Sequence, residues 1–339
     1  MNLKIREMDK TEAKQLQRLG LKTFLRSLEA FWLPRPDKAM VAVLDGKIVG
    51  GFMYSFETFN GKKLGHVDFF FIEPAYAGQG IGGKLCSEGV DFLWKEGCDY
   101  LAAVVRDDNA GSWAAFEKNG FVAASLPKVA KELKMTGFIK TYVKHMFGFS
   151  PGCDFYFAVR PEVSAEYFSK KLKPSQTAVH LFMNFALLLL PAVAALSVVL
   201  PIFIIFVGMI FFGFAGTLFS RRRWHYRMTD GGFLISVIVF LSGGFFPMFG
   251  GWYPDKYENT AKFRRDMAVN ALFLWVFLIG IFIAFPLFGL SNGLVYFLLI
   301  LKCFPIPHVN FGSTRVFRWN KIVYGLMILI TLFLVACIA

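Results

Sequence analysis

The sequence is poor in the residues that build metal centres and disulfide frameworks. Its five cysteines and five histidines are scattered along 339 residues, and no two histidines stand three or four residues apart. Zinc needs three or four protein ligands, and a disulfide framework needs paired cysteines. We therefore expect reduced thiols and no metal site. The N-terminus is charged and amphipathic, so we also expect no secretory signal peptide.

Acidic residues are scarce in the second half of the chain. Residues 161–339 carry 15 Lys and Arg against 6 Asp and Glu, which accounts for most of the net charge of +13. The same region is strongly apolar, so its basic residues fit a membrane–water interface, where lipid headgroups are anionic. We therefore expect a lipid bilayer as a partner, and no nucleic acid.

Long apolar runs dominate this region. Of all residues, 55% are hydrophobic and 41 are Phe, and the mean hydropathy is +0.49. A helix of about 20 apolar residues crosses a bilayer core. The sequence predicts a polar linker over 161–176 and an all-α polytopic membrane domain over 177–339. The apolar runs are 178–219, which fits two spans turning near Pro201, and then 232–248, 267–288, 291–306 and 322–339.

Positive charge indicates how these runs cross the bilayer. Basic residues are enriched on the cytosolic side of membrane proteins. Four arginines follow the first two spans and are expected there: Arg221, Arg222, Arg223 and Arg227. The later basic clusters share that side only if 232–248 enters and leaves on one face. We therefore expect about five full spans, one re-entrant segment, a cytosolic first domain and an external C-terminus.

The stretch FPIPHVNFGSTRVFRWNK near the C-terminus faintly resembles the Pro-x-Pro-Pro-Leu-Asp-Gly region of microbial site-2 metalloproteases. In that family the Asp is a zinc ligand, and a His-Glu-x-x-His helix supplies the others. Here Asn310 stands nearest to the Asp position, and the Gly is displaced to Gly312. The first-helix candidate reads FFGFAGTLF and has no histidine. The resemblance implies the scaffold without the metal.

A glycine-rich loop is the clearest motif of the first half. The loop YAGQGIGGKL, Tyr76 to Leu85, follows a stretch with strand character and precedes one with helical spacing. Such a turn is an anion site, because backbone N–H groups and the helix dipole favour negative charge. The dinucleotide fingerprint Gly78-x-Gly80-x-x-Gly83 fits it, and so does a P-loop without its Ser or Thr. A tight turn with no ligand fits as well.

A second motif separates these alternatives. After a further strand the chain reads NAGSWAAFEKNGF, in which Asn109 is a helix N-cap and Gly120 a C-terminal glycine. A dinucleotide fold would place an acidic residue at the tip of its second strand, whereas Asp99 lies where that strand begins. Together the loop and this motif resemble the two signatures of the GNAT superfamily of N-acetyltransferases, over residues 1–160.

The resemblance implies an α+β fold, with a mixed central sheet flanked by helices, and acetyl-CoA as the cofactor. The fourth strand would splay from the fifth, and the pantetheine arm would pair there with the backbone of Phe71 and Ile72. Asn109 would contact the cofactor further along. Backbone amides of the loop would hold the pyrophosphate: Gly78, Gln79, Gly80, Ile81, Gly82 and Gly83.

Several positions depart from the family's pattern. Its proton-donating Tyr is Phe116 here, and its first loop position, usually Arg or Gln, is Ala77. The Glu that members acetylating protein N-termini often carry on the fifth strand is Val104. The cofactor half of the site is therefore better preserved than the catalytic half.

His66 and Asp68 are the catalytic candidates. The period of two along the fourth strand puts His66, Asp68, Phe70 and Ile72 on one face. An imidazole can take a proton from an ammonium near neutral pH. Asp68 could orient His66, act as the base itself, or bind the cation of the acceptor. A strand histidine with no catalytic role fits His66 equally.

Residues 127–147 form a basic amphipathic insertion, in which five lysines alternate with apolar residues at helical spacing. Such a helix can lie on anionic lipid, or it can cover the sheet with solvated lysines. We favour the membrane, because the apolar region follows.

The sequence as a whole predicts a multi-pass membrane protein that transfers an acetyl group from acetyl-CoA to an amine acceptor at the cytosolic membrane face. The acceptor would be a protein, a lipid headgroup or a small metabolite. A catalytically weak or inactive acetyl-CoA sensor that acts through its membrane domain is the alternative. A transporter is a third, against which stands the lack of acidic residues inside the expected spans.

Overall fold

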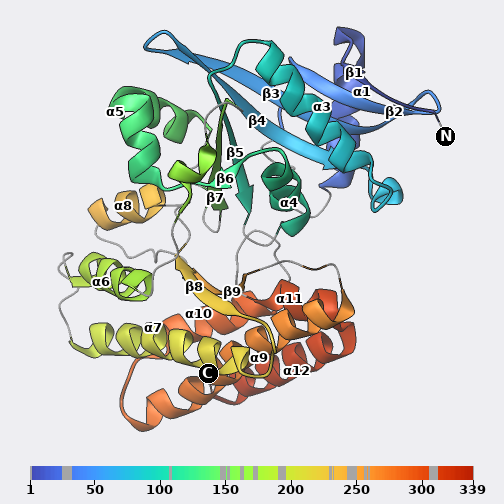
Figure 1. Ribbon diagram of the computed structural model, residues 1–339. Coiled ribbons are helices and arrows are strands. Elements are labelled where there is room, and N and C mark those ends of the chain that lie inside the picture. The colour runs from blue at the N-terminus through green and yellow to red at the C-terminus, as the bar shows by residue number, and fades with distance from the viewer. Residues whose placement is uncertain are drawn as a thin grey trace. The chain divides into compact units, whose positions relative to one another are not determined.

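The computed structural model describes residues 2–24, 33–106, 109–145, 150, 153–160, 164–170, 175–189, 196–228, 231, 233–242, 250–255, 258, 260–304 and 312–338. The chain forms two compact units, Met1–Lys171 and Leu172–Ala339 (Figure 1). The boundary between them falls inside the polar stretch 161–176. Each unit has its own hydrophobic core.

A sheet of seven described strands forms the first unit, in the order β1-β2-β3-β4-β5-β7-β6. Only β4 and β5 pair in parallel, and the other neighbours are antiparallel. The expected mixed sheet is therefore confirmed. The strands are β1 Leu3–Glu7, β2 Ala39–Leu44, β3 Lys47–Phe59, β4 Lys62–Ile72, β5 Tyr100–Arg106, β6 Val122–Ala123 and β7 Cys153–Val159.

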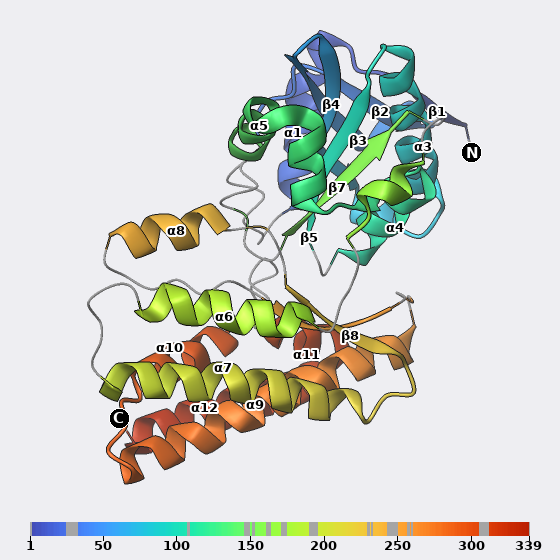
Figure 2. The same cartoon turned by 60° about the vertical axis from the view of Figure 1, so that its left-hand side comes forward.

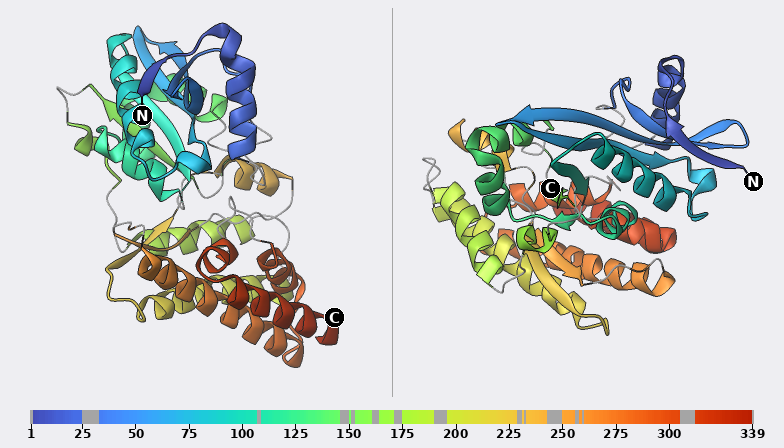
Figure 3. Two further views of the ribbon diagram at one scale, coloured as in Figure 1. Left: turned by 90° about the vertical axis from the view of Figure 1, so that its right-hand side faces the viewer. Right: turned by 45° about the horizontal axis from the view of Figure 1, so that its top comes forward.

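Helices cover both faces of this sheet (Figure 3). On one face α1 (Ala13–Thr23) buries Leu16 among strand residues that include Phe71. On the other, α3 (Ile81–Lys95) and α4 (Ala110–Lys118) pack around Phe52 through Leu85 and Phe116. Short 3₁₀ turns lie at Lys10–Glu12, Pro74–Tyr76 and Ala165–Phe168. The sheet is thus covered on both faces, as the resemblance implied.

Two Asx-Gly turns set the register of the long strands. Asp45 and Gly46 have φ of 46° and 84°, and they join β2 to β3 in a hairpin. Asn60 and Gly61, with φ of 50° and 73°, join β3 to β4 in the same way. Two successive positive φ values suit the right-handed twist of the paired strands. These turns therefore fix which residues of β4 face β3.

The parallel ladder between β4 and β5 is short. It runs from Leu64 opposite Tyr100 to Val67 opposite Ala103, although β4 continues to Ile72 and β5 to Arg106. Beyond Val67 the edge of β4 that faces β5 has left the ladder, while its other edge still pairs with β3 through Ile72. The two strands therefore part where the family resemblance places the pantetheine arm.

An irregularity in β4 coincides with this parting. The register between β3 and β4 shifts between Met53 and Tyr54, so that Phe69 and Val67 are partnered and Asp68 is the extra residue. A bulge of this kind leaves one residue unpaired and bends the strand. It explains how β4 turns away from β5, and it places Asp68 at the bend.

The basic insertion forms α5 (Leu126–Lys144) and covers the sheet. Val129 and Leu133 are buried in a core with β5 and β7, and a Cβ on Gly137 would meet the Phe59 ring at 2.8 Å. The chain kinks at Lys134, which has φ 56°. Of the two interpretations of this helix, the structure shows the cover on the sheet, and nothing in it shows contact with lipid.

The second unit is mainly helical (Figure 2), with a two-stranded ribbon of β8 and β9. Among its described residues, two helices are long and apolar enough to cross a membrane by length and composition: Val199–Thr217 and Ala261–Leu287. Both belong to elements that pack on each other, α7 and α9. The elements are α6 Ser175–Leu189, α7 Leu196–Thr217, β8 Trp224–Met228, α8 Phe233–Leu241, β9 Gly250–Pro254, α9 Ala261–Leu287, α10 Gly293–Lys302, α11 Ser313–Trp319 and α12 Lys321–Ile338.

Two expectations for this unit can be compared with the helices that the structure describes. The turn expected near Pro201 is wrong, because Pro201 lies inside α7 near its start and the helices α6 and α7 are separated by residues 190–195. Pro201 is the sixth residue of α7, so its missing N–H removes the helical hydrogen bond to the carbonyl of Ser197. The nine residues of α8 are too short for a crossing of about 30 Å. A re-entrant segment over 232–248 stays a prediction, since 243–249 lie outside the described residues.

Candidate active site

The glycine loop has the geometry of an anion site. Gly78 and Gly80 both have φ of +80°, which other residues rarely adopt, and α3 begins directly after Gly80. A Cβ built on Gly78, Gly80 or Gly83 meets nothing within 4 Å, so the space above the loop is open. The first amides of α3 have no carbonyl of their own helix to bond. A pyrophosphate would therefore find backbone donors and the positive end of a helix dipole here.

The loop lies beside the end of β4. A Cβ on Gly82 would be 3.4 Å from Cγ1 of Ile72 and 3.7 Å from Cζ of Phe70. Phe71 and Ile72 pair with Gly51 and Gly50 of β3, which leaves their other edge toward the gap between β4 and β5. An extended arm and a pyrophosphate could thus be bound by adjoining backbone groups. Asn109 caps α4, its side-chain oxygen accepting from the amide of Ser112 at 3.4 Å.

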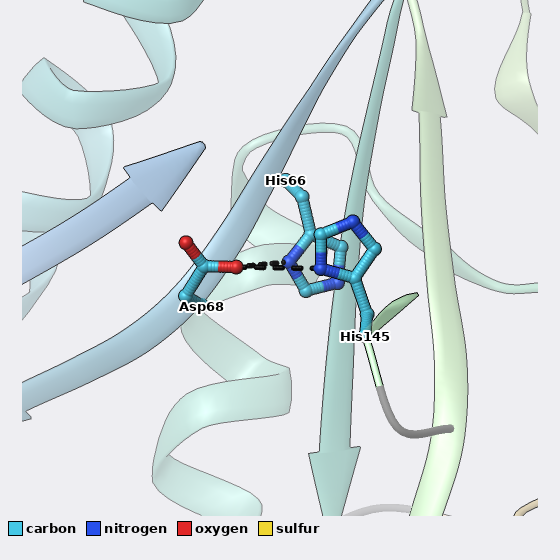
Figure 4. Close-up of side chains that lie close together, drawn as sticks. All are labelled: His66, Asp68 and His145. Atoms are coloured by element: carbon cyan, nitrogen blue, oxygen red, sulfur yellow. Dashed lines mark hydrogen bonds and ion pairs between the residues drawn. The ribbon is translucent and has the colours of Figure 1, made fainter. Parts of the chain in front are cut away.

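His66 and Asp68 form a hydrogen-bonded dyad at the bend of β4 (Figure 4). Nδ1 of His66 lies 2.8 Å from Oδ1 of Asp68, and the hydroxyl of Ser55 donates to the same oxygen at 3.1 Å. His66 is 3% exposed, and its Nε2 has no hydrogen-bond partner among the described residues. A carboxylate on Nδ1 fixes the proton there and leaves the Nε2 lone pair to accept another.

His145, directly after α5, completes a buried cluster with this dyad. Its ring stacks on that of His66, with centroids 3.3 Å apart, and its Nδ1 lies 3.4 Å from Oδ1 of Asp68 (Figure 4). Its Nε2 lies 3.4 Å from Oε1 of the buried Glu57, which also pairs with Lys144 at 3.0 Å. The end of α5 is therefore tied to β3 and β4 by charge.

The pKa values of the four groups in this cluster are shifted in different directions. The groups are His66, His145, Glu57 and Asp68. Burial lowers the pKa of His66 to about 4, and the nearby charge of His145 adds to that effect. Burial would also lower the pKa of His145, but its contacts with Asp68 and Glu57 raise it above its usual value. The pKa of Glu57 falls to about 2, because the contacts with His145 and Lys144 outweigh its burial. The pKa of Asp68 is likewise lowered by both imidazoles against its burial. His66 is thus neutral near neutral pH, and His145 is the more readily protonated of the two imidazoles.

His66, Asp68 and His145 could also hold a metal by the separation of their donor atoms, which lie within 4.8 Å of one another. The ring planes, however, are only 12° apart. Two imidazoles that share one metal each point a lone pair at it, which stacked parallel rings cannot do without splaying. The arrangement suits two hydrogen bonds to one carboxylate better than coordination.

Comparison with known proteins places this site in a family. The sequence model of the Acetyltransferase (GNAT) family matches residues 5–121. An uncharacterized N-acetyltransferase of Archaeoglobus fulgidus is 30% identical over 108 residues, covering 26% of this chain and 73% of the relative. This chain belongs to the GNAT acetyltransferase family.

Other GNAT relatives match a smaller part of their own length. The thialysine N-epsilon-acetyltransferase of Sus scrofa is 29% identical over 98 residues, which are 29% of this chain and 56% of that enzyme. This chain thus spans only about half of that enzyme's length. A Salmonella typhimurium protein solved with its cofactor acetyl-CoA has a TM-score of 0.31 at 19% identity, over 36% of this chain and 81% of its own. The glycine loop and the gap between β4 and β5 fit the acetyl-CoA that the GNAT family implies.

The bulge corrects one expectation about the site. Phe70 and Ile72 do not share a face with His66, because Val67, Phe70 and Ile72 all pack on the core under α3. Phe69 and Phe71 pack on the α1 side instead. The period of two fails where the extra residue, Asp68, is inserted. Asp68 nevertheless reaches His66, so the catalytic pair expected from the sequence is brought together.

The structure shows where the residues that depart from the GNAT sequence pattern lie. Phe116 is 3% exposed and packs edge-on to Phe70, with ring centroids 5.9 Å apart, so it fills the core where the family has a hydroxyl. Val104 lies on β5 just past the last pair with β4. Neither side chain can exchange a proton.

Sequence reasoning missed Ser55, Glu57 and His145 as parts of this site. Glu57 is 3% exposed on β3, an unusual place for a carboxylate unless it is paired. The sequence signal was a carboxylate in a strand in which apolar and aromatic residues predominate. His145 lies 79 positions after His66 in the sequence, and no local spacing links the two.

Proposed function

We propose that this chain is an N-acetyltransferase that moves the acetyl group of acetyl-CoA to an amine, with His66 as general base and Asp68 as its positioning partner. The single observation that carries this proposal is the dyad's position. His66 lies one residue before β4 leaves β5, and the glycine loop adjoins the far end of the same strand. A base, an acyl site and a pyrophosphate site would then follow one another along β4.

The residues support a direct transfer of the acetyl group from acetyl-CoA to the amine. Nε2 of neutral His66 takes a proton from the acceptor ammonium, whose nitrogen then attacks the thioester carbonyl. Bound acetyl-CoA supplies an activated acyl group and a thiolate leaving group. Amides of β4 beyond Val67 are outside the ladder with β5 and can donate to the developing oxyanion. With Phe116 in place of a Tyr, the thiolate leaves without an acid from that position.

Buried carboxylates next to His66 favour a cationic acceptor. Asp68 holds its charge because its pKa is lowered by the two imidazoles, despite burial. An ammonium that reaches His66 can pair with this carboxylate before it loses its proton. The pig relative is named for the ε-amine of thialysine, a primary amine. Primary amines are accordingly the first probes to use.

The second unit supports a membrane location as part of the proposal. α7 and α9 have the length and composition of spans. Arg221, Arg222 and Arg223 follow α7 directly, and a further basic group opens α9, which suits one common cytosolic side. We propose a multi-pass anchor that holds the acetyl-CoA site at the cytosolic face. Trypsin should cut after these arginines in inside-out vesicles only; cleavage in sealed right-side-out vesicles would contradict the orientation.

The decisive test of turnover uses the full chain in detergent, with CoA release measured by a thiol reagent in the presence of primary amines. His66→Gln should lower kcat by about 100-fold or more while acetyl-CoA binding is kept, as expected for loss of a general base. His225→Gln is the matched control, because His225 also pairs with an aspartate, Asp255, at 2.7 Å but lies in the second unit. Equal rates for His66→Gln and wild type would overturn the role of His66.

The sensor remains a second candidate because Phe116 is buried in the core without a hydroxyl. The same experiment separates the two functions. Acetyl-CoA binding that Gly82→Trp abolishes, with no CoA release under any amine, would favour a sensor. Release that His66→Gln suppresses would favour the enzyme.

A further inference from the structure

The helix α5 carries an exposed row of apolar side chains on its outer side. After the kink at Lys134, the side chains of Met135, Ile139 and Val143 follow at intervals of four residues, which places them on one helix face. Their exposed fractions are 62%, 52% and 44%. Single exposed apolar residues are normal on a protein surface, but a row of them along one helix face is typical of a contact surface. We call Met135, Ile139 and Val143 the α5 stripe.

The opposite side of the same helix packs on the sheet. Gly137 and Thr141 are buried there. A Cβ on Gly137 would meet the ring of Phe59 at 2.8 Å. The hydroxyl of Thr141 donates to Oε2 of Glu57 at 3.2 Å. Packing on the sheet therefore accounts for one side of α5, and the α5 stripe on the other side is left exposed by the described part of the chain.

Positive charge surrounds the α5 stripe. The helix Leu126–Lys144 contains five lysines and one acidic residue, Glu132, so its net charge is +4. The carboxylate of Glu132 accepts a hydrogen bond from the hydroxyl of Tyr100. The lysines in exposed positions are Lys131, Lys134, Lys140 and Lys144. An anionic surface would complement this charge, and it would do so on both sides of the kink.

We propose that the α5 stripe docks on the surface of a bilayer that contains anionic lipid. An interfacial helix places its apolar side chains at the boundary of the acyl chains, and the lysines beside them reach the lipid phosphates. A protein partner fits less well, because protein interfaces are enriched in aromatic residues and arginine and depleted in lysine. The span-like helices α7 and α9 make a bilayer the surface that this chain is expected to meet.

Docking in this way turns one face of the sheet toward the lipid. His145 directly follows α5 and stacks on His66, so α5 lies on the face of the sheet that carries the dyad. The helices α3 and α4 pack on the other face, around Phe52. An acceptor amine at the level of the lipid headgroups would then approach the His66 side of the sheet. The docking rests on the proposed membrane location, but not on acetyl transfer.

The test uses the full chain in nanodiscs, with an environment-sensitive fluorophore on Ile139→Cys. Cys303→Ser and Cys337→Ser remove the two cysteines that are not buried. Discs of phosphatidylglycerol and phosphatidylcholine carry a spin-labelled lipid, which quenches only a fluorophore at the bilayer. The fluorophore at position 139 should be quenched in these discs and should lose most of the quenching in discs of phosphatidylcholine alone. A fluorophore on Lys95→Cys of α3, at the other face of the sheet, should be quenched in neither.

Charge reversal tests the lysines around the stripe. Lys131→Glu combined with Lys140→Glu should remove most of the quenching at position 139, because it turns attraction to anionic lipid into repulsion. Lys95→Glu combined with Lys118→Glu is the matched control. It makes the same change of charge at exposed positions on α3 and α4, and it should leave the quenching unchanged.

The outcomes separate this docking from the membrane location on which it rests. A chain that enters the nanodiscs with position 139 unquenched, or quenched alike in both double variants, would overturn the docking alone. A chain that stays out of the nanodiscs would contradict the membrane location as well. A fluorescence shift at position 139 that depends on protein concentration in detergent, without quenching by lipid, would identify a second copy of this chain as the partner and would also overturn the proposal.

Discussion

The imidazole rings of His66 and His145 lie face to face, with centroids 3.3 Å and planes 12° apart, over one shared carboxylate, Asp68. Two cationic rings in this position would repel each other, so the stack favours one neutral and one charged imidazole. The neutral one is His66, which is the more deeply buried. The stack also covers one face of His66, whose Nε2 is buried without a hydrogen-bond partner among the described residues.

Replacing His145 should raise the pKa of His66. In His145→Phe the ring remains but the charge that helps to lower the pKa of His66 is gone. The pKa of His66 should move up from about 4 toward 6.5 without reaching it, because burial is the larger cause. NMR titration of the imidazole proton measures this, with His225→Phe as the control. An unchanged or lower pKa would show that the stack has no electrostatic effect.

The stability of the first unit should fall between pH 6.5 and 4. In this range unfolded His66 binds a proton that the native state excludes, because its native pKa is lowered to about 4. Stability therefore rises with pH there and is lost on acidification. Wild type should lose on the order of 3 kcal/mol of unfolding free energy in this range, because the pKa of His66 is about 2.5 units lower in the native state. His66→Asn should not show this loss. His145, whose pKa is raised, acts in the opposite direction, so urea unfolding of wild type and variant at both pH values isolates His66.

Asp68→Asn should impair turnover while acetyl-CoA binding is preserved. The amide keeps the size of the side chain, but it removes the charge that holds the proton on Nδ1 of His66. The wrong tautomer then places a proton on Nε2, and kcat should fall by about 10²-fold or more, as for loss of proton transfer. Steady-state kinetics should show an unchanged KM for acetyl-CoA. A rate near that of wild type would mean that His66 needs no orientation by Asp68.

Gly82→Trp should abolish acetyl-CoA binding. The indole would enter the space between α3 and the end of β4, where Ile72 already lies 3.4 Å from a Cβ at this position. Calorimetric titration of acetyl-CoA measures the loss. Lys95→Trp, at the other end of the same helix and exposed, is the matched control and should bind as wild type does. Binding retained by both variants would make the loop a turn with no ligand.

The close approach of α7 and α9 predicts an effect on the second unit. A Cβ on Gly208 would lie 1.9 Å from Cζ of Phe277, whose ring is buried and stacked on Phe212. Gly208→Ala should destabilise the unit by about 1–3 kcal/mol through overpacking. Gly280→Ala on α9 meets nothing within 4 Å and should be neutral or slightly stabilising, since Ala favours helix. Equal Tm values for both variants in detergent would contradict this packing.

Local sequence determined much of the first unit. Asn109 and the glycine loop can be recognised in the sequence, because a helix N-cap and a turn with positive φ depend on neighbouring residues only. The hairpin at Asp45-Gly46 follows from the same local chemistry. His66 and Asp68 stand two positions apart, so their contact was foreseeable. Each of these features is decided within a few residues of the chain.

Only the tertiary structure decided the rest. The bulge at Asp68 depends on how β3 pairs with β4, and it reversed the expected face of Phe70 and Ile72. His145 reaches His66 because α5 packs on the sheet. Arg227 and Arg315 both lie against the ring of Tyr253, although β8 and α11 are far apart in the chain. Contacts between residues this far apart in the chain depend on packing and strand register, and no periodicity along one segment records them.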